Sequence, residues 1–176
     1  MKILAVIPAR AGSKGIPNKN IRILNNKPLI SYSIENAKNS KYITDIVVTT
    51  DSDIVRVIAA QMGVDSIERK PELCGDDITL DSVIYDAIPK KTKWDYIITM
   101  QPTSPTLQVG TLDKAIEYTI KNKLDTVISA INRPHLSWRE DDGKKLPNYT
   151  ERLNRQYLPA NYMETGAFVI SKFNIV

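Results

Sequence analysis

The residues best suited to chemistry lie close together near the start of the chain, between positions 7 and 20. This stretch contains two glycines, two prolines, three cationic side chains, a serine and two asparagines, and it follows an apolar run directly. Glycines let backbone N–H groups approach phosphate oxygens, and Arg10, Lys14 and Lys19 supply positive charge. The composition therefore predicts a loop that binds a polyanion, with a nucleoside triphosphate as the leading candidate.

Two common phosphate-binding motifs do not describe this loop. A Walker A motif ends in Gly-Lys-Ser/Thr, which is absent here, and the spacing of Gly12 and Gly15 does not fit the dinucleotide pattern G-x-G-x-x-G. Composition alone leaves a polar surface loop as the alternative. The order of the residues in the loop has to decide between the two interpretations.

The elements that must position this loop are strands and helices in alternation. Apolar or β-branched runs predict strands, and apolar stripes at helical spacing predict helices between them. The repetition predicts an α/β fold with three αβα layers, a mostly parallel Rossmann-like sheet and right-handed crossovers. The expected strands cover residues 3–7, 45–50, 64–67, 94–100, 125–131 and 166–171, and the expected helices cover 28–37, 53–62, 80–88 and 109–121.

Ligands of such sheets bind beyond the carboxyl ends of the strands. Besides the loop, that edge is expected to carry Asp51, the segment 101–104 and the pair Asn132-Arg133. Asp51 is expected to cap the helix that follows it, with Ser52 or Asp53 as the other candidates for this role.

Residues 132–164 show no clear period. The segment holds Pro134, Gly143, Pro147 and Pro159 among many charges and scattered aromatic residues. So long an irregular segment in a small domain indicates an arm, a lid or a dimerisation element. His135, the only histidine of the chain, lies here, and one histidine makes neither a catalytic triad nor a zinc site.

Length and composition indicate one soluble domain spanning residues 1–176. No run of 18 apolar residues exists, so no membrane span is expected, and the first apolar run is too short for a signal peptide. The single Cys74 fits a reducing cytoplasm. The net charge of +4 is spread over helix faces instead of forming one basic stripe, which disfavours nucleic-acid binding.

The ordered string Ile-Pro-Ala-Arg-Ala-Gly-Ser-Lys-Gly-Ile-Pro-Asn-Lys-Asn-Ile at residues 7–21 resembles the signature of the N-acylneuraminate cytidylyltransferases, the CMP-sialic acid synthetases. Further blocks match in order, so that the resemblance covers essentially the whole chain. These blocks are Pro-Leu-Ile at 28–30, Arg-Lys-Pro-Glu-Leu at 69–73, Gln-Pro-Thr-Ser-Pro at 101–105, Arg-Gln-Tyr-Leu-Pro at 155–159 and Glu-Thr-Gly-Ala at 164–167.

The resemblance implies a fold of the nucleotide-diphospho-sugar transferase type and a transfer of CMP from CTP. The acceptor is the anomeric hydroxyl of a nine-carbon 2-keto acid sugar, and pyrophosphate leaves. It also implies a cytoplasmic homodimer formed through the 132–164 arm and a requirement for Mg²⁺. In-line attack on phosphorus needs the charge of the triphosphate to be offset and its geometry to be held, which agrees with a cationic loop.

By this resemblance, the expected site residues fall into three groups. Arg10 and Lys19 are expected to be catalytic, whereas Lys14 and Arg22 are equally well explained as solvated charges. The expected CTP-binding residues are Pro8, Ala9, Arg10, Gly12, Ser13, Asn20, Arg69 and Thr79. The expected sugar-binding residues are Gln101, Thr103, Ser104, Tyr157, Glu164 and Thr165.

Three alternatives stay open. Arg69 could form a salt bridge within its loop. Met163 stands where sialic acid enzymes often have an arginine, which leaves legionaminic, pseudaminic or another 2-keto acid sugar as the acceptor. The family places an Asp-x-Asp pair that binds the metal beyond the position that corresponds to Val176, so no metal ligand is expected in this chain. A catalytically deficient CTP-binding module is therefore the alternative from a different class.

Overall fold

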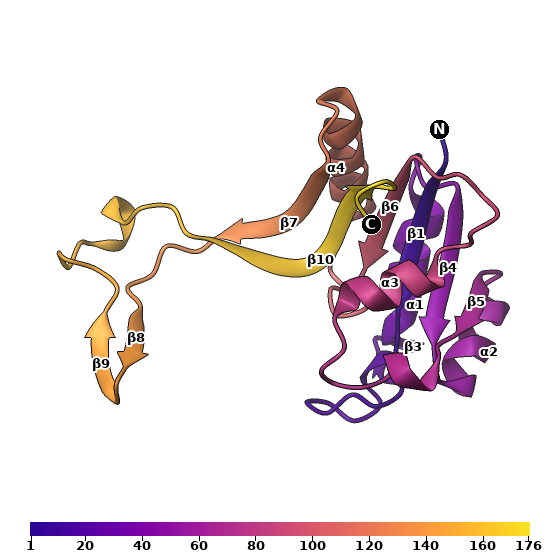
Figure 1. The fold of residues 1–176 in the computed structure, drawn as a ribbon, viewed down its shortest axis with the longest axis horizontal. Coiled ribbons are helices and arrows are strands. Elements are labelled where there is room, and N and C mark those ends of the chain that lie inside the picture. Colours follow the sequence, from indigo (N-terminus) through magenta and orange to yellow (C-terminus); the bar gives the residue numbers. More distant parts are fainter. The chain divides into compact units, whose positions relative to one another are not determined.

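The computed structural model describes residues 1–176 and contains a six-stranded sheet in the order β5-β4-β1-β6-β10-β7 (Figure 1). The chain forms two compact units. One consists of residues 1–129 together with 166–176, and the other of residues 130–165.

Four neighbouring strands of the sheet run parallel, as β1 pairs with β4 and β6, and β4 pairs with β5. β10 is antiparallel to β6, with Phe168 opposite Met100. The predicted α/β class with a mostly parallel sheet is therefore confirmed. The strands are β1 (Ile3–Pro8), β4 (Asp45–Thr50), β5 (Asp65–Glu68), β6 (Tyr96–Met100), β7 (Thr126–Asn132) and β10 (Tyr162–Lys172).

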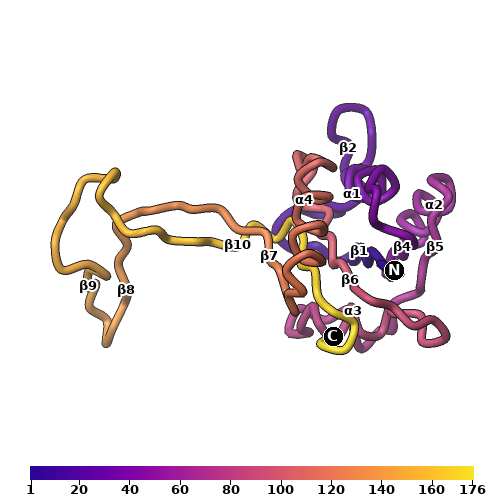
Figure 2. The backbone as a smooth tube through the Cα atoms, turned by 90° about the horizontal axis from the view of Figure 1, so that it is seen from above, coloured from indigo at the N-terminus to yellow at the C-terminus, as the bar shows by residue number.

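Helices cover both faces of the sheet (Figure 2). Alternate side chains of β1 point to opposite faces, so that Ile3, Ala5 and Ile7 pack with α1, α2 and α4, whereas Leu4 and Val6 pack with α3. Burial of each isoleucine, leucine or valine side chain among these contributes about 1.5–3 kcal/mol. The helices are α1 (Leu29–Asn39), α2 (Asp53–Gln61), α3 (Leu80–Ala87) and α4 (Val109–Lys121).

Short elements connect the strands to the helices. The 3-10 helix η1 (Lys19–Ile21) closes the loop after β1, and the ribbon of β2 (Ile23–Leu24) and β3 (Lys27–Pro28) leads into α1. The expected helix began at Pro28. In the structure Pro28 is the N-cap of α1, and the first helical residue is Leu29. The 3-10 helix η2 (Pro71–Leu73) lies between β5 and α3.

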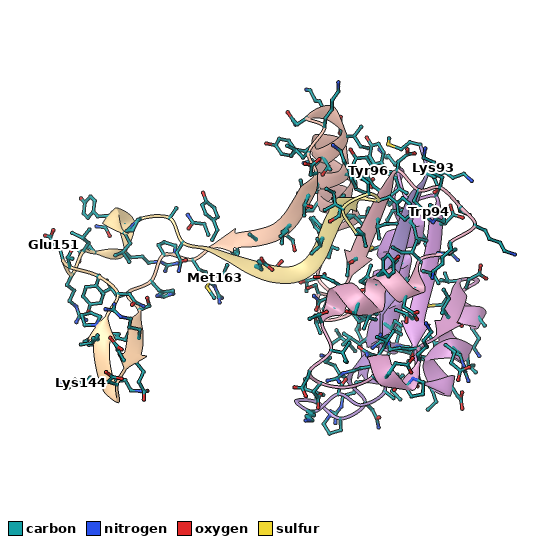
Figure 3. All side chains as sticks on the ribbon, viewed as in Figure 1. Lys93, Trp94, Tyr96, Lys144, Glu151 and Met163 are labelled. Atoms are coloured by element: carbon teal, nitrogen blue, oxygen red, sulfur yellow. The ribbon has the colours of Figure 1, made fainter.

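The unit of residues 130–165 contains regular structure that the sequence pattern did not reveal. Strands β8 (Trp138–Asp141) and β9 (Lys144–Pro147) form an antiparallel hairpin that turns at Asp142 and Gly143. These two residues have φ values of 46° and 74°, as a type I′ turn requires. Figure 3 labels Lys144 directly after this turn. The prediction of an irregular segment is therefore wrong for the hairpin.

Aromatic side chains of this unit are partly stacked and largely exposed. The rings of Trp138 and Tyr149 meet edge to face with centroids 6.0 Å apart. Tyr157, in the 3-10 helix η3 (Arg155–Tyr157), is 69% exposed, and Tyr162 is 72% exposed. Such exposed rings are suited to contact with another surface. None of the helices in the structure combines the length and apolar character that a membrane span requires.

Candidate active site

The loop after β1 lies at the edge of the sheet where parallel strands end. Because β1, β4 and β6 run in the same direction, their carboxyl ends bring three segments together. These segments are the loop of residues 9–20, the residues that follow Thr50, and the segment that begins at Gln101. The parallel strands therefore bring these three segments to one edge of the sheet, where the sequence predicted them.

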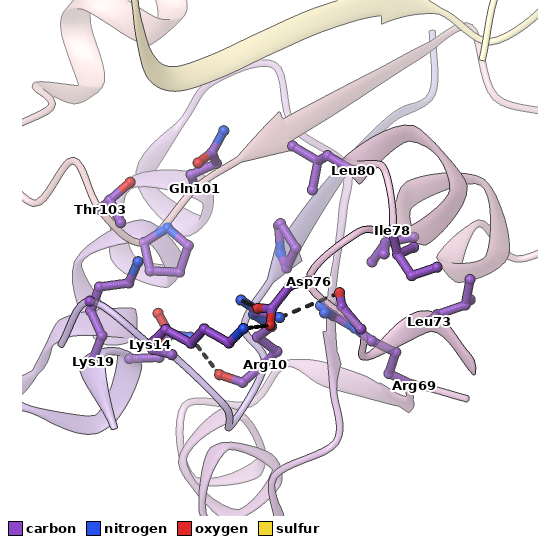
Figure 4. Close-up of a pocket in the computed structure, with 17 residues that line it drawn as sticks. Arg10, Lys14, Lys19, Arg69, Leu73, Asp76, Ile78, Leu80, Gln101 and Thr103 are labelled. Atoms are coloured by element: carbon purple, nitrogen blue, oxygen red, sulfur yellow. Dashed lines mark hydrogen bonds and ion pairs between the residues drawn. The ribbon is translucent and has the colours of Figure 1, made fainter. Parts of the chain in front are cut away.

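A cavity of about 370 Å³ opens between the loop after β1, the segment after β6 and the 69–80 region (Figure 4). Four cationic side chains line it, and Asp76 is its only carboxylate. The predicted site residues along its wall are Pro8, Arg10, Ser13, Lys19, Asn20, Arg69, Gln101 and Thr103. The structure thus gathers residues from three separate segments around one cationic cavity.

The start of the loop is fixed by hydrogen bonds to the end of β4. The backbone N–H of Ala9 donates to the carbonyl of Thr49 at 3.0 Å, and the Thr50 hydroxyl donates to the carbonyl of Ala9 at 2.6 Å. Ala9 is fully buried and lies behind the cavity wall. Gly12 is exposed and does not line the cavity either.

Asp51 also holds the loop, and the prediction that it caps α2 is wrong. Its Oδ1 accepts a hydrogen bond from the backbone N–H of Ala11 at 2.7 Å. The cap of α2 is Ser52, whose side chain accepts from the N–H of Val55 at 3.4 Å. Asp51 is too early in the chain to cap α2 when Ser52 occupies the N-cap position.

Asn20 supports the loop from its far end. It is 6% exposed, and its Nδ2 donates to the carbonyl of Arg10 at 3.0 Å. Asn18, which precedes η1, has a left-handed backbone with φ of 55°. Asparagine tolerates this conformation better than most residues, which allows the sharp turn into η1.

Arg10 extends from the loop to the segment after η2. Its Nη1 donates to the carbonyl of Cys74 at 3.2 Å and to that of Gly75 at 3.4 Å, and its Nη2 pairs with Asp76 Oδ1 at 2.6 Å. Lys14 pairs with the other carboxylate oxygen of Asp76, so it is not a free solvated charge here. Lys14 and Arg10 hold the pKa of Asp76 below its ordinary value.

Lys19 differs from these two cations because its ammonium group has no hydrogen-bond or ion-pair partner in the chain. Figure 4 places it on the same side of the cavity as Thr103, with Arg69 on the opposite side. An unpaired ammonium beside a cavity can bind an anionic ligand without first losing another contact.

Arg69 is 6% exposed and forms no salt bridge, so the alternative of a loop ion pair does not hold in this structure. Its Nη2 donates to the carbonyl of Thr49 at 3.0 Å, while its buried Nε has no partner. Burial lowers the pKa of the guanidinium, which nevertheless stays charged because arginine does not deprotonate in proteins. An unpaired buried N–H group is costly and marks a place where an acceptor fits.

Gln101 and Thr103 line the cavity after β6. Between them, Pro102 is buried and stiffens the segment, and the carbonyl of Gln101 accepts from the Ser33 hydroxyl at 3.3 Å. Gly166 approaches the Gln101 side chain closely: a Cβ atom on it would lie 3.4 Å from Nε2. The carbonyl of Ser104 accepts from the N–H of Leu107 in the turn that leads to α4.

The structure does not bring every predicted site residue to the cavity wall. Thr79 stands at the N-cap of α3, is exposed, and shares a hydrogen bond with the hydroxyl of Ser82 at 3.0 Å. Tyr157, Glu164 and Thr165 belong to the unit of residues 130–165. The roles of these residues stay predictions.

The cysteine and the carboxylates near the cavity provide neither an activated nucleophile nor a metal site. Burial raises the pKa of the Cys74 thiol, whose Sγ donates to the carbonyl of Lys70, so it is not an activated nucleophile. No group of three or more His, Cys, Asp or Glu side chains could hold a metal ion. The one carboxylate on the cavity wall, Asp76, is already paired with two cations, so these residues do not form a Mg²⁺ site by themselves.

Sequence reasoning missed Asp76 and the apolar part of the wall. Leu73, Ile78 and Leu80 lie on the Arg69 side of the cavity in Figure 4. These three apolar residues stand apart from one another in a polar loop, and their spacing matches neither a helix nor a strand. Asp76 could have been found only by asking which acidic residue balances the cations of the loop.

The sequence model of the family described as "Cytidylyltransferase" matches residues 4–170. An N-acylneuraminate cytidylyltransferase of Streptococcus agalactiae serotype V is 36% identical over 97% of this chain and 43% of its own length. A CMP-N,N'-diacetyllegionaminic acid synthase of Legionella pneumophila is 40% identical over 66% of this chain and 53% of its own length.

A solved structure of CMP:2-keto-3-deoxy-manno-octonic acid synthetase complexed with CTP has a TM-score of 0.75 to this chain. It is 16% identical and matches over 99% of this chain and 76% of that chain, which establishes a common fold. The chain spans less than half the length of the streptococcal relative.

Proposed function

This chain belongs to the cytidylyltransferase family, and we propose that its cavity binds CTP for the transfer of CMP to a 2-keto acid sugar. The observation that carries the proposal is the unpaired ammonium of Lys19, facing Arg69 across a cavity that Arg10 also lines. A triphosphate needs several cations, because its charge is spread over three phosphates, and Lys19 and Arg10 supply them on one side of the cavity while Arg69 lies on the other.

The base and the triphosphate of CTP have different requirements, and the two sides of the cavity differ accordingly. We propose that the cytosine ring lies beside the apolar side chains of Ile78 and Leu80, with Arg69 Nε donating to one of its acceptors. The triphosphate then extends toward Lys19 and the backbone of the loop at Ser13. Thr79, which lies between the wall residues Ile78 and Leu80 in the chain, is proposed to contact the nucleotide through its hydroxyl.

The reaction that follows from this placement is an in-line displacement. The anomeric hydroxyl of the sugar attacks the α-phosphorus and loses its proton, the bond to the bridging oxygen breaks, and pyrophosphate leaves with the electron pair. Lys19 and Arg10 would stabilise the negative charge that develops on the phosphate oxygens. Mg²⁺ would add charge neutralisation, but the chain offers no cluster of three or more His, Cys, Asp or Glu side chains to hold it.

The acceptor is proposed to be a nine-carbon 2-keto acid sugar of the N-acylneuraminate type. The amide of Gln101 and the hydroxyl of Thr103 on the cavity wall suit a polyhydroxylated ligand. Ser104, Tyr157, Glu164 and Thr165 are proposed to complete its binding. The Legionella relative is named for a legionaminic acid, which supports that sugar as the alternative acceptor. Pseudaminic acid is a further proposed alternative.

We further propose a cytoplasmic homodimer in which residues 132–164 form the contact. The exposed rings of Trp138, Tyr157 and Tyr162 in this unit support the proposal, because aromatic side chains are enriched in the centres of protein interfaces. A CTP-binding module without catalysis is the second candidate, but the streptococcal and Legionella relatives are both named as enzymes, which supports the transferase instead.

The test uses two measurements on the same protein. Calorimetric titration with CTP, and with GTP as the control, measures whether the cavity selects a pyrimidine triphosphate; lack of CTP binding would overturn the proposal. Pyrophosphate release is then measured with CTP, Mg²⁺ and a panel of 2-keto acid sugars. Release with one sugar identifies the acceptor, whereas CTP binding without release for any sugar supports the module.

A further inference from the structure

One anionic side chain, Asp76, lines the cavity, and it pairs with two of the three cations of the loop. Asp76 Oδ1 lies 2.6 Å from Arg10 Nη2, and its Oδ2 pairs with Lys14. Figure 4 shows the carboxylate between these two side chains at the centre of the cavity. Arg10 and Lys14 both come from the loop that faces the proposed triphosphate.

The contacts of Arg10 involve a whole segment and not a single side chain. The same guanidinium also donates to the carbonyls of Cys74 and Gly75, so residues 74–76 are bound to the loop through Arg10. These residues precede Ile78 and Leu80, which line the proposed base side of the cavity. Release of Arg10 would therefore free the segment that leads into that wall.

A carboxylate and a phosphate use the same donors in the same geometry. An arginine N–H that points at a carboxylate oxygen cannot also point at a phosphate oxygen, so the two anions compete for Arg10. Lys19 has no such internal partner. An entering triphosphate can thus bind Lys19 first and meet Asp76 only afterwards.

We propose that Asp76 is an internal counter-anion that occupies Arg10 and Lys14 while no nucleotide is bound, and that a triphosphate displaces it and releases residues 74–76. The inference rests on the proposed function and names a regulation of the same site. Side chains in the pair between Asp76 and Lys14 are 37% and 79% exposed, and exposed ion pairs are weak enough to be exchanged for a multiply charged ligand.

The neighbouring residue supplies a matched control. Asp77 is exposed, and its side chain has no hydrogen-bond or ion-pair partner. Asp76→Asn and Asp77→Asn therefore remove the same charge one residue apart, but only the first removes a competitor for Arg10 and Lys14. Both substitutions keep the shape of the side chain and lie at exposed positions, so both proteins are expected to fold.

The experiment titrates wild type, Asp76→Asn and Asp77→Asn with CTP and with inorganic pyrophosphate by calorimetry, without a divalent ion. We expect Asp76→Asn to bind both ligands about two- to fivefold more tightly than wild type, which is the size of an exposed ion pair. Asp77→Asn should differ from wild type by less. An equal increase in affinity in both variants would mean that only the overall electrostatic field of the site had changed, and would overturn the inference.

Weaker binding by Asp76→Asn would also overturn it, because the carboxylate would then be part of the ligand-binding surface. In both of these outcomes wild type still binds CTP, so the proposed function stands. If none of the three proteins binds CTP, the proposed function fails and the inference fails with it.

Discussion

Asp51 Oδ1 accepts a hydrogen bond of 2.7 Å from the backbone N–H of Ala11, a residue 40 positions earlier in the chain. The bond joins the end of β4 to the loop that follows β1, next to Arg10. It fixes the direction in which the loop leaves the sheet. A carboxylate that accepts a backbone N–H in this way orders the loop before any ligand arrives.

Asp51→Ala should loosen the loop locally. The N–H of Ala11 loses its acceptor, so we expect faster hydrogen exchange at this amide and a decrease of about 1 kcal/mol in the free energy of unfolding. Asp51→Asn is the control, because its side-chain oxygen can still accept the bond. The measurements are amide exchange by NMR and denaturant unfolding. Equal protection of Ala11 in wild type and Asp51→Ala would contradict the role given to Asp51.

Lys19→Ala should weaken CTP binding without affecting stability. The ammonium has no partner in the chain, so its removal breaks no internal contact, but a charge-assisted bond to a phosphate would be lost. Such a bond contributes about 1.5–3 kcal/mol, which corresponds to a loss of affinity of roughly ten- to 150-fold. Calorimetry measures the affinity.

Lys121→Ala is the matched control for this substitution, since Lys121 is exposed at the end of α4. It should bind CTP as wild type does. Unchanged affinity in Lys19→Ala as well would remove Lys19 from the site.

The sequence predicted the elements of the sheet because their signals are local. The β-branched run at β4 and the apolar stripe of α4 (Val109–Lys121) have the same bounds in the structure as in the prediction. The place of β10 between β6 and β7 was not predictable, because strand order depends on pairings between distant segments. The hairpin of β8 and β9 was missed because its strands are rich in charged residues, although Asp142-Gly143 is a turn signal.

The site shows the same division. The glycines and cations of the loop predicted a polyanion site, and in the structure Arg10, Lys14 and Lys19 of this loop do line one cavity. The contacts of two acidic residues with the loop were not predicted. Asp51 was expected to cap α2, and Asp76 lies in a segment without a sequence pattern. Their partners are 40 and 66 residues away, so only the tertiary structure brings them together.

Gly166→Ala should destabilise the protein by about 1–2 kcal/mol, because Gly166 has a φ of +69° that an L-residue with a Cβ adopts only at a cost. The new methyl group would also touch the amide of Gln101, so we expect the Gln101 side-chain resonances to shift. Gly110→Ala is the control, since Gly110 lies in α4 with open space around it and alanine favours helix. Denaturant unfolding should show opposite signs for the two variants; a neutral Gly166→Ala would contradict the argument.

The ion pairs of Asp76 predict how stability depends on pH. Lys14 and Arg10 lower the pKa of this carboxyl in the folded protein from its ordinary value of 3.8. A group whose pKa is lower in the folded state stabilises the protein above its unfolded pKa, and this contribution disappears as the pH falls through the folded pKa. Asp76→Asn should therefore be less stable than wild type near neutral pH, and the difference should vanish in acid.

The measurement is thermal unfolding of wild type, Asp76→Asn and Asp77→Asn from about pH 7 to about pH 3, a range that spans the titration of carboxyl groups. The difference between wild type and Asp76→Asn is expected to be small, because the pairs are exposed, and to decrease as the pH falls. Asp77→Asn should show no comparable trend, because its side chain has no cationic partner. A difference between wild type and Asp76→Asn that stays constant down to the acid limit would mean that the pairs with Arg10 and Lys14 do not stabilise the folded protein.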